Sequence, residues 1–175
     1  MSLRAAGLIL VLFFSIVWSQ SHFEESDDQV RKEQVLSMYQ SYKNRSFSDV
    51  QDITTEEYLE VSKKEEAVLV DVRTKKEMQI SMIPGAITLT EFEKNKDNYK
   101  DKEVNIVIYC TIGYRSGLYT EELLKENLNA YNLIGGVLGW AHAGQTFISS
   151  NGDSLRVHVY GDDWDLLPEG YESVW

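Results

Sequence analysis

The chain has 175 residues, of which 28 are acidic and 17 are basic, and its net charge is −11. A surface this acidic disfavours DNA, RNA and anionic membranes as partners. The single cysteine excludes both an internal disulfide and Cys-x-x-Cys redox chemistry.

The chain begins with the features of a secretory signal. Arg4 supplies a positive charge, and residues 8–18 form an uninterrupted, mostly apolar run. This run is shorter than the about 20 residues that span a bilayer. We therefore expect residues 1–19 to be a signal peptide that is cleaved after Ser19, which leaves a mature form without a membrane span. The protein would then enter the secretory pathway or leave the cell, and Asn44 would be a glycosylation site. An uncleaved membrane anchor is the alternative.

Residues 20–50 form a polar segment that leads into the main domain. Ser26 and Gln29 have the spacing of a capping box. Three apolar or aromatic residues follow at helical spacing: Val35, Tyr39 and Tyr42. The pattern predicts an amphipathic helix over residues 24–44, with a solvated linker as the alternative.

Short apolar segments alternate with helical stretches over residues 51–145. The predicted strands cover residues 68–72, 86–89, 104–109 and 130–134, and predicted helices cover residues 54–59, 91–99 and 116–127. This alternation predicts an α/β fold with a mostly parallel sheet and helices on both faces. Nucleophiles and ligands in such folds lie beyond the carboxyl ends of the strands. Cys110 directly follows one of these strands.

The residues after Cys110 favour a reactive thiolate. A short turn that contains Gly113 leads to Arg115, and a helix is predicted from about Ser116. The backbone N–H groups of residues 111–115 can point inward and form an anion site beside the sulfur. The helix N-terminus and the arginine add positive charge. The alternative for a lone cysteine is a small buried hydrophobic residue.

Four segments of the chain, over residues 52–143, together resemble the rhodanese-like sulfurtransferases. In order, they are Asp71-Val72-Arg73, Ile83-Pro84-Gly85-Ala86, the loop from Cys110 to Arg115, and Gly135-Gly136-Val137-Leu138-Gly139-Trp140. Phosphatases of the same fold have one more residue between the cysteine and the arginine, and position 116 is a serine here. Many members have Gly-His before the Ile-Pro-Gly-Ala segment. This chain has Ser81-Met82, which we interpret as a variation in packing.

The resemblance implies sulfur transfer through a persulfide on Cys110. A small donor such as thiosulfate would supply the sulfur, and a thiol or cyanide, or a protein thiol, would accept it. The backbone N–H groups that would bind the terminal sulfur belong to Thr111, Ile112, Gly113, Tyr114 and Arg115. Ile112 and Tyr114 would also shape the pocket, and structural support is expected from Asp71, Arg73 and Ser116.

The resemblance implies no cofactor, and three scattered histidines with one cysteine form no metal-binding pattern. Two other functions stay open at this point. One is a non-catalytic or redox-sensing binding module with the same fold. The other is a reductase of arsenate or phosphate oxyanions.

Residues 146–175 extend beyond the region of resemblance. Residues 151–153 have the composition of a turn, and residues 155–160 alternate as a strand does. The pattern predicts a β-hairpin-like extension packed on the domain. Its aromatic residues would either pack on the domain or form a partner surface: Trp164, Tyr171 and Trp175.

Overall fold

A computed structural model describes residues 26–64, 66–100, 103–149 and 152–175. The predicted signal peptide, residues 1–19, lies outside these ranges. Among the helices within them, none combines the length and the apolar character that crossing a membrane requires.

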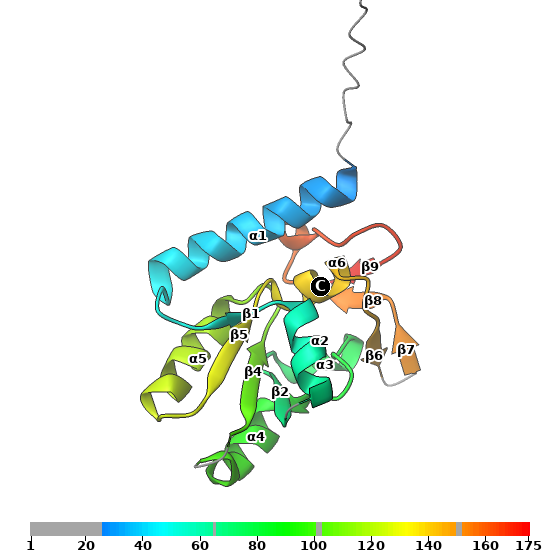
Figure 1. Cartoon of the computed structure of the whole chain (residues 1–175). Helices are drawn as coiled ribbons and strands as arrows, with labels where there is room; N and C mark the ends of the chain where they lie inside the picture. Colours follow the sequence, from blue (N-terminus) through cyan, green and yellow to red (C-terminus); the bar gives the residue numbers. More distant parts are fainter. Residues whose placement is uncertain (1–25, 65, 101–102, 150–151) are drawn as a thin grey trace, which may run out of the picture.

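Five parallel strands form the central sheet (Figure 1). They are β1 (Asp52–Ile53), β2 (Ala67–Asp71), β3 (Ile87–Thr88), β4 (Asn105–Tyr109) and β5 (Ala130–Leu133), in the order β1-β5-β4-β2-β3. All five residues of the central strand β4 are buried, as expected for a parallel sheet that is covered on both faces. The predicted α/β class is confirmed. The short edge strand β1 is an addition to the predicted strands.

Helices cover both faces of the sheet. Alternate residues of a strand point to opposite faces, so Ile106 and Ile108 pack with Phe92 and Leu123, whereas Val107 and Tyr109 belong to a second cluster on the other face. The first face is covered by α4 (Leu89–Asn95) and α5 (Tyr114–Lys125). The second cluster includes residues of α2 (Thr55–Lys64) and α6 (Gly136–His142).

Capping decides where several helices begin and end. The helix predicted over residues 91–99 begins earlier, because Thr88 and Glu91 form a capping box, and it ends as the 3₁₀ helix η1 (Lys96–Tyr99). A second capping box joins Thr74 and Glu77 at the start of α3 (Lys75–Ile80). Helix α2 continues beyond its predicted end, to Lys64.

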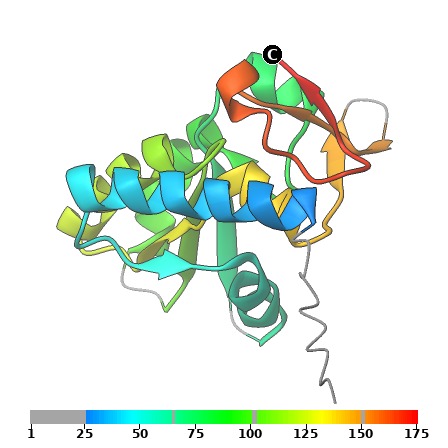
Figure 2. The same ribbon diagram turned by 90° about the horizontal axis from the view of Figure 1, so that it is seen from above.

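The N-terminal helix α1 (Asp27–Ser46) packs against α5 and α6 and lies across the carboxyl ends of the strands (Figures 1 and 2). Its buried residues are Val35 and Tyr39. Half of the predicted capping box forms: Ser26 accepts a hydrogen bond from the backbone of Gln29, whose side chain instead donates to Glu33.

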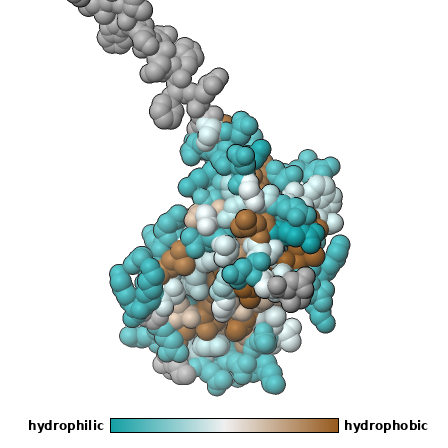
Figure 3. All heavy atoms as spheres, turned by 90° about the vertical axis from the view of Figure 1, so that its right-hand side faces the viewer, coloured by the Kyte–Doolittle hydropathy of each residue, from teal (hydrophilic) through white to brown (hydrophobic). Residues whose placement is uncertain are grey.

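The predicted C-terminal β extension is present, and the strand predicted over residues 155–160 lies outside its antiparallel pair. Strand β6 (Phe147–Ser149) pairs antiparallel with β7 (Gly152–Ser154), and β8 (Arg156–His158) pairs in parallel with β9 (Glu172–Val174). Val157 and Val159 are fully buried in the main core, and the N–H of His158 donates to Ser81, so β8 lies against α3. The 3₁₀ helix η2 (Asp162–Trp164) lies between β8 and β9. Figure 3 shows the face that carries this extension, where hydrophilic side chains cover most of the surface and hydrophobic ones lie between them.

Candidate active site

Cys110 follows the last residue of β4, at the carboxyl edge of the sheet. Gly113 has a φ of +104°, which glycine adopts without strain, and is the N-cap residue of α5. The chain therefore passes from strand to helix within a few residues. Helix α5 begins at Tyr114, two residues before the predicted start, and this places Arg115 in its first turn.

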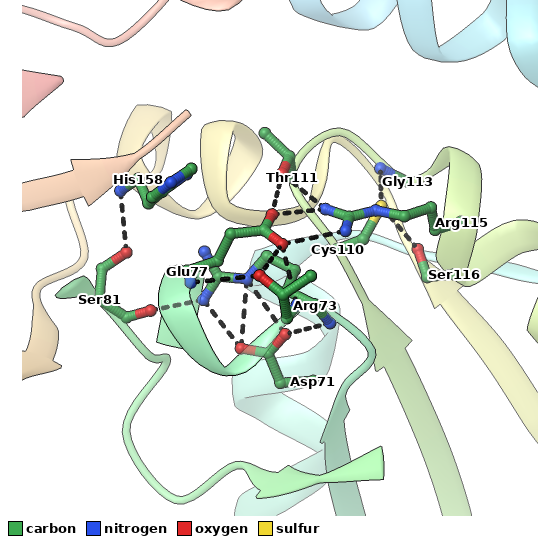
Figure 4. Close-up of polar contacts among 11 residues, drawn as sticks. Asp71, Arg73, Glu77, Ser81, Cys110, Thr111, Gly113, Arg115, Ser116 and His158 are labelled. Atoms are coloured by element: carbon green, nitrogen blue, oxygen red, sulfur yellow. Dashed lines mark hydrogen bonds and ion pairs between the residues drawn. The ribbon is translucent and has the colours of Figure 1, made fainter. Parts of the chain in front are cut away.

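The Cys110 sulfur lies at the base of the loop and the residue is only 2% exposed. Its Sγ accepts a hydrogen bond from the N–H of Gly113 at 3.1 Å, and Oγ of Ser116 lies 3.5 Å away (Figure 4). Both groups can donate to a thiolate, and hydrogen bonds to an ionised acceptor are the stronger kind. The inward direction of the other loop N–H groups stays a prediction.

Tyr39 of α1 and Asn132 of β5 hold the loop from behind. The Asn132 amide donates to the carbonyl of Gly113 at 2.9 Å and to the hydroxyl of Tyr39 at 3.1 Å. That hydroxyl in turn donates to Asp52 at 2.5 Å, and Lys43 pairs with the same carboxylate at 2.6 Å. Burial raises the pKa of Tyr39, and the hydrogen bond to Asp52 raises it further, so the hydroxyl keeps its proton.

Arg115 forms a two-point ion pair with Glu77 of α3. The two guanidinium nitrogens lie 2.6 and 3.1 Å from the carboxylate oxygens of Glu77, and one of them also donates to Oγ1 of Thr111 at 3.1 Å (Figure 4). Glu77 also accepts hydrogen bonds from the backbone and the hydroxyl of Thr74. The arginine is therefore braced by a residue that sequence reasoning did not assign to the site.

Glu77 is ionised at neutral pH. Burial by itself raises the pKa of this carboxyl, but the hydrogen bonds from Arg115 and Thr74 outweigh burial and lower the pKa to about 2. Burial also disfavours the charged form of Arg115, whereas Glu77 and the nearby Cys110 raise the pKa of the guanidinium overall. The sequence signal for Glu77 was its capping-box spacing from Thr74, which indicates a helix start.

Asp71 and Arg73 form a separate ion pair beneath the site. Both side chains are fully buried, and the closest nitrogen and oxygen lie 2.8 Å apart. Arg73 also donates to the carbonyl of Ser81 at 2.5 Å and lies over the ring of Tyr109. Neither Asp71 nor Arg73 lines the pocket described below, and their supporting role stays a prediction.

The segment in which this chain departs from the family pattern anchors the C-terminal extension. Oγ of Ser81 accepts a hydrogen bond from the N–H of His158 at 3.1 Å, and Met82 forms an antiparallel bridge with Ile148. Among the described residues, no histidine lines the pocket above Cys110 that is described below. Burial lowers the pKa of both His142 and His158.

A pocket of about 320 Å³ opens above Cys110. The loop contributes four of the predicted residues to its lining: Thr111, Ile112, Tyr114 and Arg115. Three further lining residues come from segments that precede or follow residues 51–145 in the sequence: Tyr42, Tyr160 and Trp164. Local sequence signals placed Tyr42 on a helix and Trp164 in the tail, but they gave no sign that the two would meet at the cysteine.

Comparison with known proteins adds independent support. The chain is 32% identical over 98 residues to a sulfurtransferase from Allochromatium vinosum, which covers 50% of this chain and 84% of the relative. It is 29% identical over 142 residues to a tRNA uridine(34) hydroxylase from Acinetobacter baylyi, which covers 65% of this chain and 44% of that protein.

A solved structure shows the same fold. The thiosulfate sulfurtransferase from Pseudomonas aeruginosa aligns with 76% of this chain and 26% of its own chain, with a TM-score of 0.55 and 21% identity. The chain thus spans less than half of the Acinetobacter hydroxylase and about a quarter of the Pseudomonas protein.

The family itself is defined by a sequence profile of the rhodanese-like domain, which matches residues 54–143, just over half of the 175 residues. The matched region contains β2, the loop at Cys110 and α6. The parallel sheet, the position of the cysteine and this match agree, and the chain belongs to the rhodanese-like domain family.

Proposed function

We propose that the protein is a sulfurtransferase that carries a sulfane sulfur as a persulfide on Cys110. The observation that carries this proposal is the position of the Cys110 sulfur, which lines a pocket at the carboxyl edge of the sheet and accepts the Gly113 N–H. A terminal sulfur on Cys110 would extend into the same pocket. The relative from Allochromatium vinosum, named as a sulfurtransferase, supports this assignment.

The reaction consists of two displacements at sulfur. The Cys110 thiolate attacks the outer sulfur of a donor such as thiosulfate, a new S–S bond forms, and sulfite leaves with the electron pair of the broken bond. The thiolate of an acceptor, or cyanide, then attacks the terminal sulfur of the persulfide. The Cys110–sulfur bond breaks, and its electron pair regenerates the thiolate. Neither step needs a general base when both nucleophiles are anions.

The size of the loop from Cys110 to Arg115 favours the binding of a single sulfur atom over that of a tetrahedral oxyanion. Four residues separate Cys110 from Arg115, and the N–H of Gly113 lies only 3.1 Å from Sγ. A single sulfur atom needs less room than an oxyanion with four substituents. In addition, reduction of an oxyanion through a thiol needs a second thiol to resolve the intermediate, and with one cysteine in this chain that thiol would have to come from another molecule.

Intact mass spectrometry after treatment with thiosulfate tests the proposal. We expect the protein to gain the mass of one sulfur atom, and a reductant to remove it. Cys110→Ser should show no gain and no turnover with a thiol acceptor, because a hydroxyl of similar size does not ionise as a thiol does. A wild-type protein that gains no sulfur from any sulfane donor would contradict the proposal and favour a binding module.

A further inference from the structure

The pocket above Cys110 has one wall made of aromatic rings. We call this set, Tyr42, Tyr114, Tyr160 and Trp164, the aromatic wall. Only Tyr114 belongs to the region that matches the family profile, residues 54–143. Tyr42 comes from α1, Trp164 from η2, and Tyr160 from the segment between β8 and η2. The matched region thus supplies the loop at Cys110, and segments outside it supply most of the wall.

The rings of the aromatic wall form a continuous series. The centroids of Tyr42 and Tyr114 lie 5.1 Å apart, Tyr42 stacks on Trp164 at 6.0 Å with an interplanar angle of 3°, and Trp164 meets Tyr160 at 5.9 Å. Tyr114 is 37% exposed and Tyr160 is 68% exposed, so ring surface remains accessible beside the pocket. Aromatic rings of this kind bind other rings through offset or edge-to-face contacts.

Contacts between α1 and the C-terminal extension fix the wall in place. Arg31 donates to the carbonyl of Leu167 at 3.1 Å, and the N–H of Glu169 donates to Asp28 at 2.8 Å. These bonds join α1 to the residues that follow Trp164. The wall is therefore preorganised by two segments that are distant in the sequence, which lowers the entropic cost of binding a ligand against it.

The charges around the pocket give little attraction for a small inorganic dianion. Arg115 is the cation of the lining, and both of its terminal nitrogens are engaged by the carboxylate of Glu77. The acidic residues Asp162 and Asp163 belong to η2 beside Trp164, and the whole chain has a net charge of −11. Apolar ring surface is thus the main source of binding free energy that the pocket offers.

We propose that the preferred sulfur donor is a small organic molecule in which an aromatic ring carries the group that holds the sulfane sulfur, as in an aryl thiosulfonate. This inference rests on the proposed sulfur transfer at Cys110. The thiolate attacks the outer sulfur of the donor, a persulfide forms, and the aryl sulfinate leaves with the electron pair of the broken S–S bond. The aromatic ring lies against the aromatic wall during this step. A pocket of about 320 Å³ fits one ring and its sulfur group.

The test compares two donors that differ only in their organic group. Benzenethiosulfonate and methanethiosulfonate have the same charge and the same reacting bond, and intact mass gives the second-order rate constant for sulfur loading of Cys110. The same two rate constants are measured for free cysteine, and their ratio gives the difference in intrinsic reactivity between the two donors. Dividing the protein's ratio by this value gives the corrected preference. We expect the protein to favour the benzene donor by about tenfold or more beyond that ratio, as an added apolar group does in a fitting pocket.

Variants of the aromatic wall locate the preference. Trp164→Ala should reduce the corrected preference at least about fivefold, and Trp164→Phe should retain most of it. Trp175→Ala is the matched control: Trp175 also belongs to the extension, is 54% exposed and does not line the pocket, so the preference should not change. Tyr160→Ala serves as a second variant, because a side chain that is 68% exposed can be truncated without opening the core.

The outcomes separate this inference from the proposed function. The inference is overturned if thiosulfate and methanethiosulfonate load Cys110 while the benzene donor shows no corrected preference. It is also overturned if both Trp164→Ala and Tyr160→Ala keep the full preference; in either case, sulfur transfer itself still stands. If none of the three donors loads Cys110 in the wild-type protein, the proposed function fails, and the inference fails with it.

Discussion

Glu77 joins three parts of the site through one carboxylate. It caps α3 together with Thr74, pairs with Arg115 at two points and lies within hydrogen-bond distance of Thr111. The residue is buried, so a neutral replacement would leave the Arg115 charge without its partner in a partly buried position. At the scale of single residues, the orientation of the loop arginine depends on this carboxylate.

Glu77→Gln should change how stability depends on pH. The folded state lowers the pKa of Glu77 to about 2, from about 4.3 in the unfolded chain. The ionised carboxylate therefore stabilises the wild-type fold above pH about 4.3, and this stabilisation is lost as the pH falls toward 2. We expect this group to contribute about 3 kcal/mol of the wild-type loss over that range. Denaturant unfolding of both proteins between pH 2 and 7 measures it.

Glu91→Gln provides the matched control. Glu91 also forms a capping box, with Thr88, but it is exposed and lies on a helix that does not reach the loop. A glutamine at this position can keep the capping box, so the replacement should change stability much less than Glu77→Gln does. Equal pH profiles for the wild type and Glu77→Gln would show that the ion pair with Arg115 does not stabilise the ionised carboxylate.

Helix α1 and the loop at Cys110 form one unit at the scale of elements. The ring of Tyr39 packs against Gly113, and a Cβ atom on Gly113 would lie 2.5 Å from that ring. Tyr39 cannot withdraw easily, because its hydroxyl is bonded to both Asp52 and Asn132. Tyr39, which lies outside the region that matches the family profile, therefore fixes the position of the Gly113 N–H. The hydrogen bond from this N–H to the Cys110 sulfur depends on it in turn.

Gly113→Ala should destabilise the protein and slow sulfur loading. The positive φ of +104° alone costs a residue with a Cβ about 1–2 kcal/mol. The clash with Tyr39 adds about 1–3 kcal/mol, as overpacking does in a core. Gly170→Ala carries the backbone cost alone, since Gly170 has a φ of +91° and a Cβ added there would meet nothing within 4 Å. The difference between the two variants therefore gives the cost of the clash with Tyr39. Thermal melts that show equal losses for the two variants would rule out the contact with Tyr39 as a constraint on the loop.

At the scale of the whole molecule, the C-terminal extension completes the main core. Phe147, Val157 and Val159 are fully buried, and they belong to the same cluster as Leu69 and Ile83. Burial of each such side chain contributes about 1.5–3 kcal/mol. The sum is comparable with the total stability of an ordinary domain, about 5–15 kcal/mol. The extension is thus part of the folded unit, although the family profile ends before it.

Removal of residues 146–175 should abolish the cooperative thermal transition that we expect of the full chain, because it exposes this cluster to water. Removal of Trp175 alone should shift the midpoint by only a few degrees, since that residue is largely exposed. Circular dichroism melts of the two shortened proteins and the full chain measure the difference. A cooperative melt of the first protein at the full-length midpoint would contradict the prediction.

The residue pattern predicts the parallel sheet and the position of Cys110 at its edge. Buried β-branched runs such as residues 104–109 have few alternatives to a central strand, and the residue after such a strand lies at the carboxyl edge. The order of four segments that resemble the rhodanese-like family predicts the fold. Helix starts were less well predicted, because they depend on caps such as Gly113 and Thr88 whose geometry a spacing rule only approximates.

The surroundings of Cys110 depend on how the whole chain packs. Glu77 and Arg115 are 38 residues apart, and Tyr42 and Trp164 come from opposite ends of the described chain, so no local pattern relates the members of either pair. The parallel pairing of β8 with β9 was missed for the same reason. Hydrophobic periodicity reports that a side chain is buried, but it does not report against what, because distant segments meet only where the packing of the whole chain brings them together.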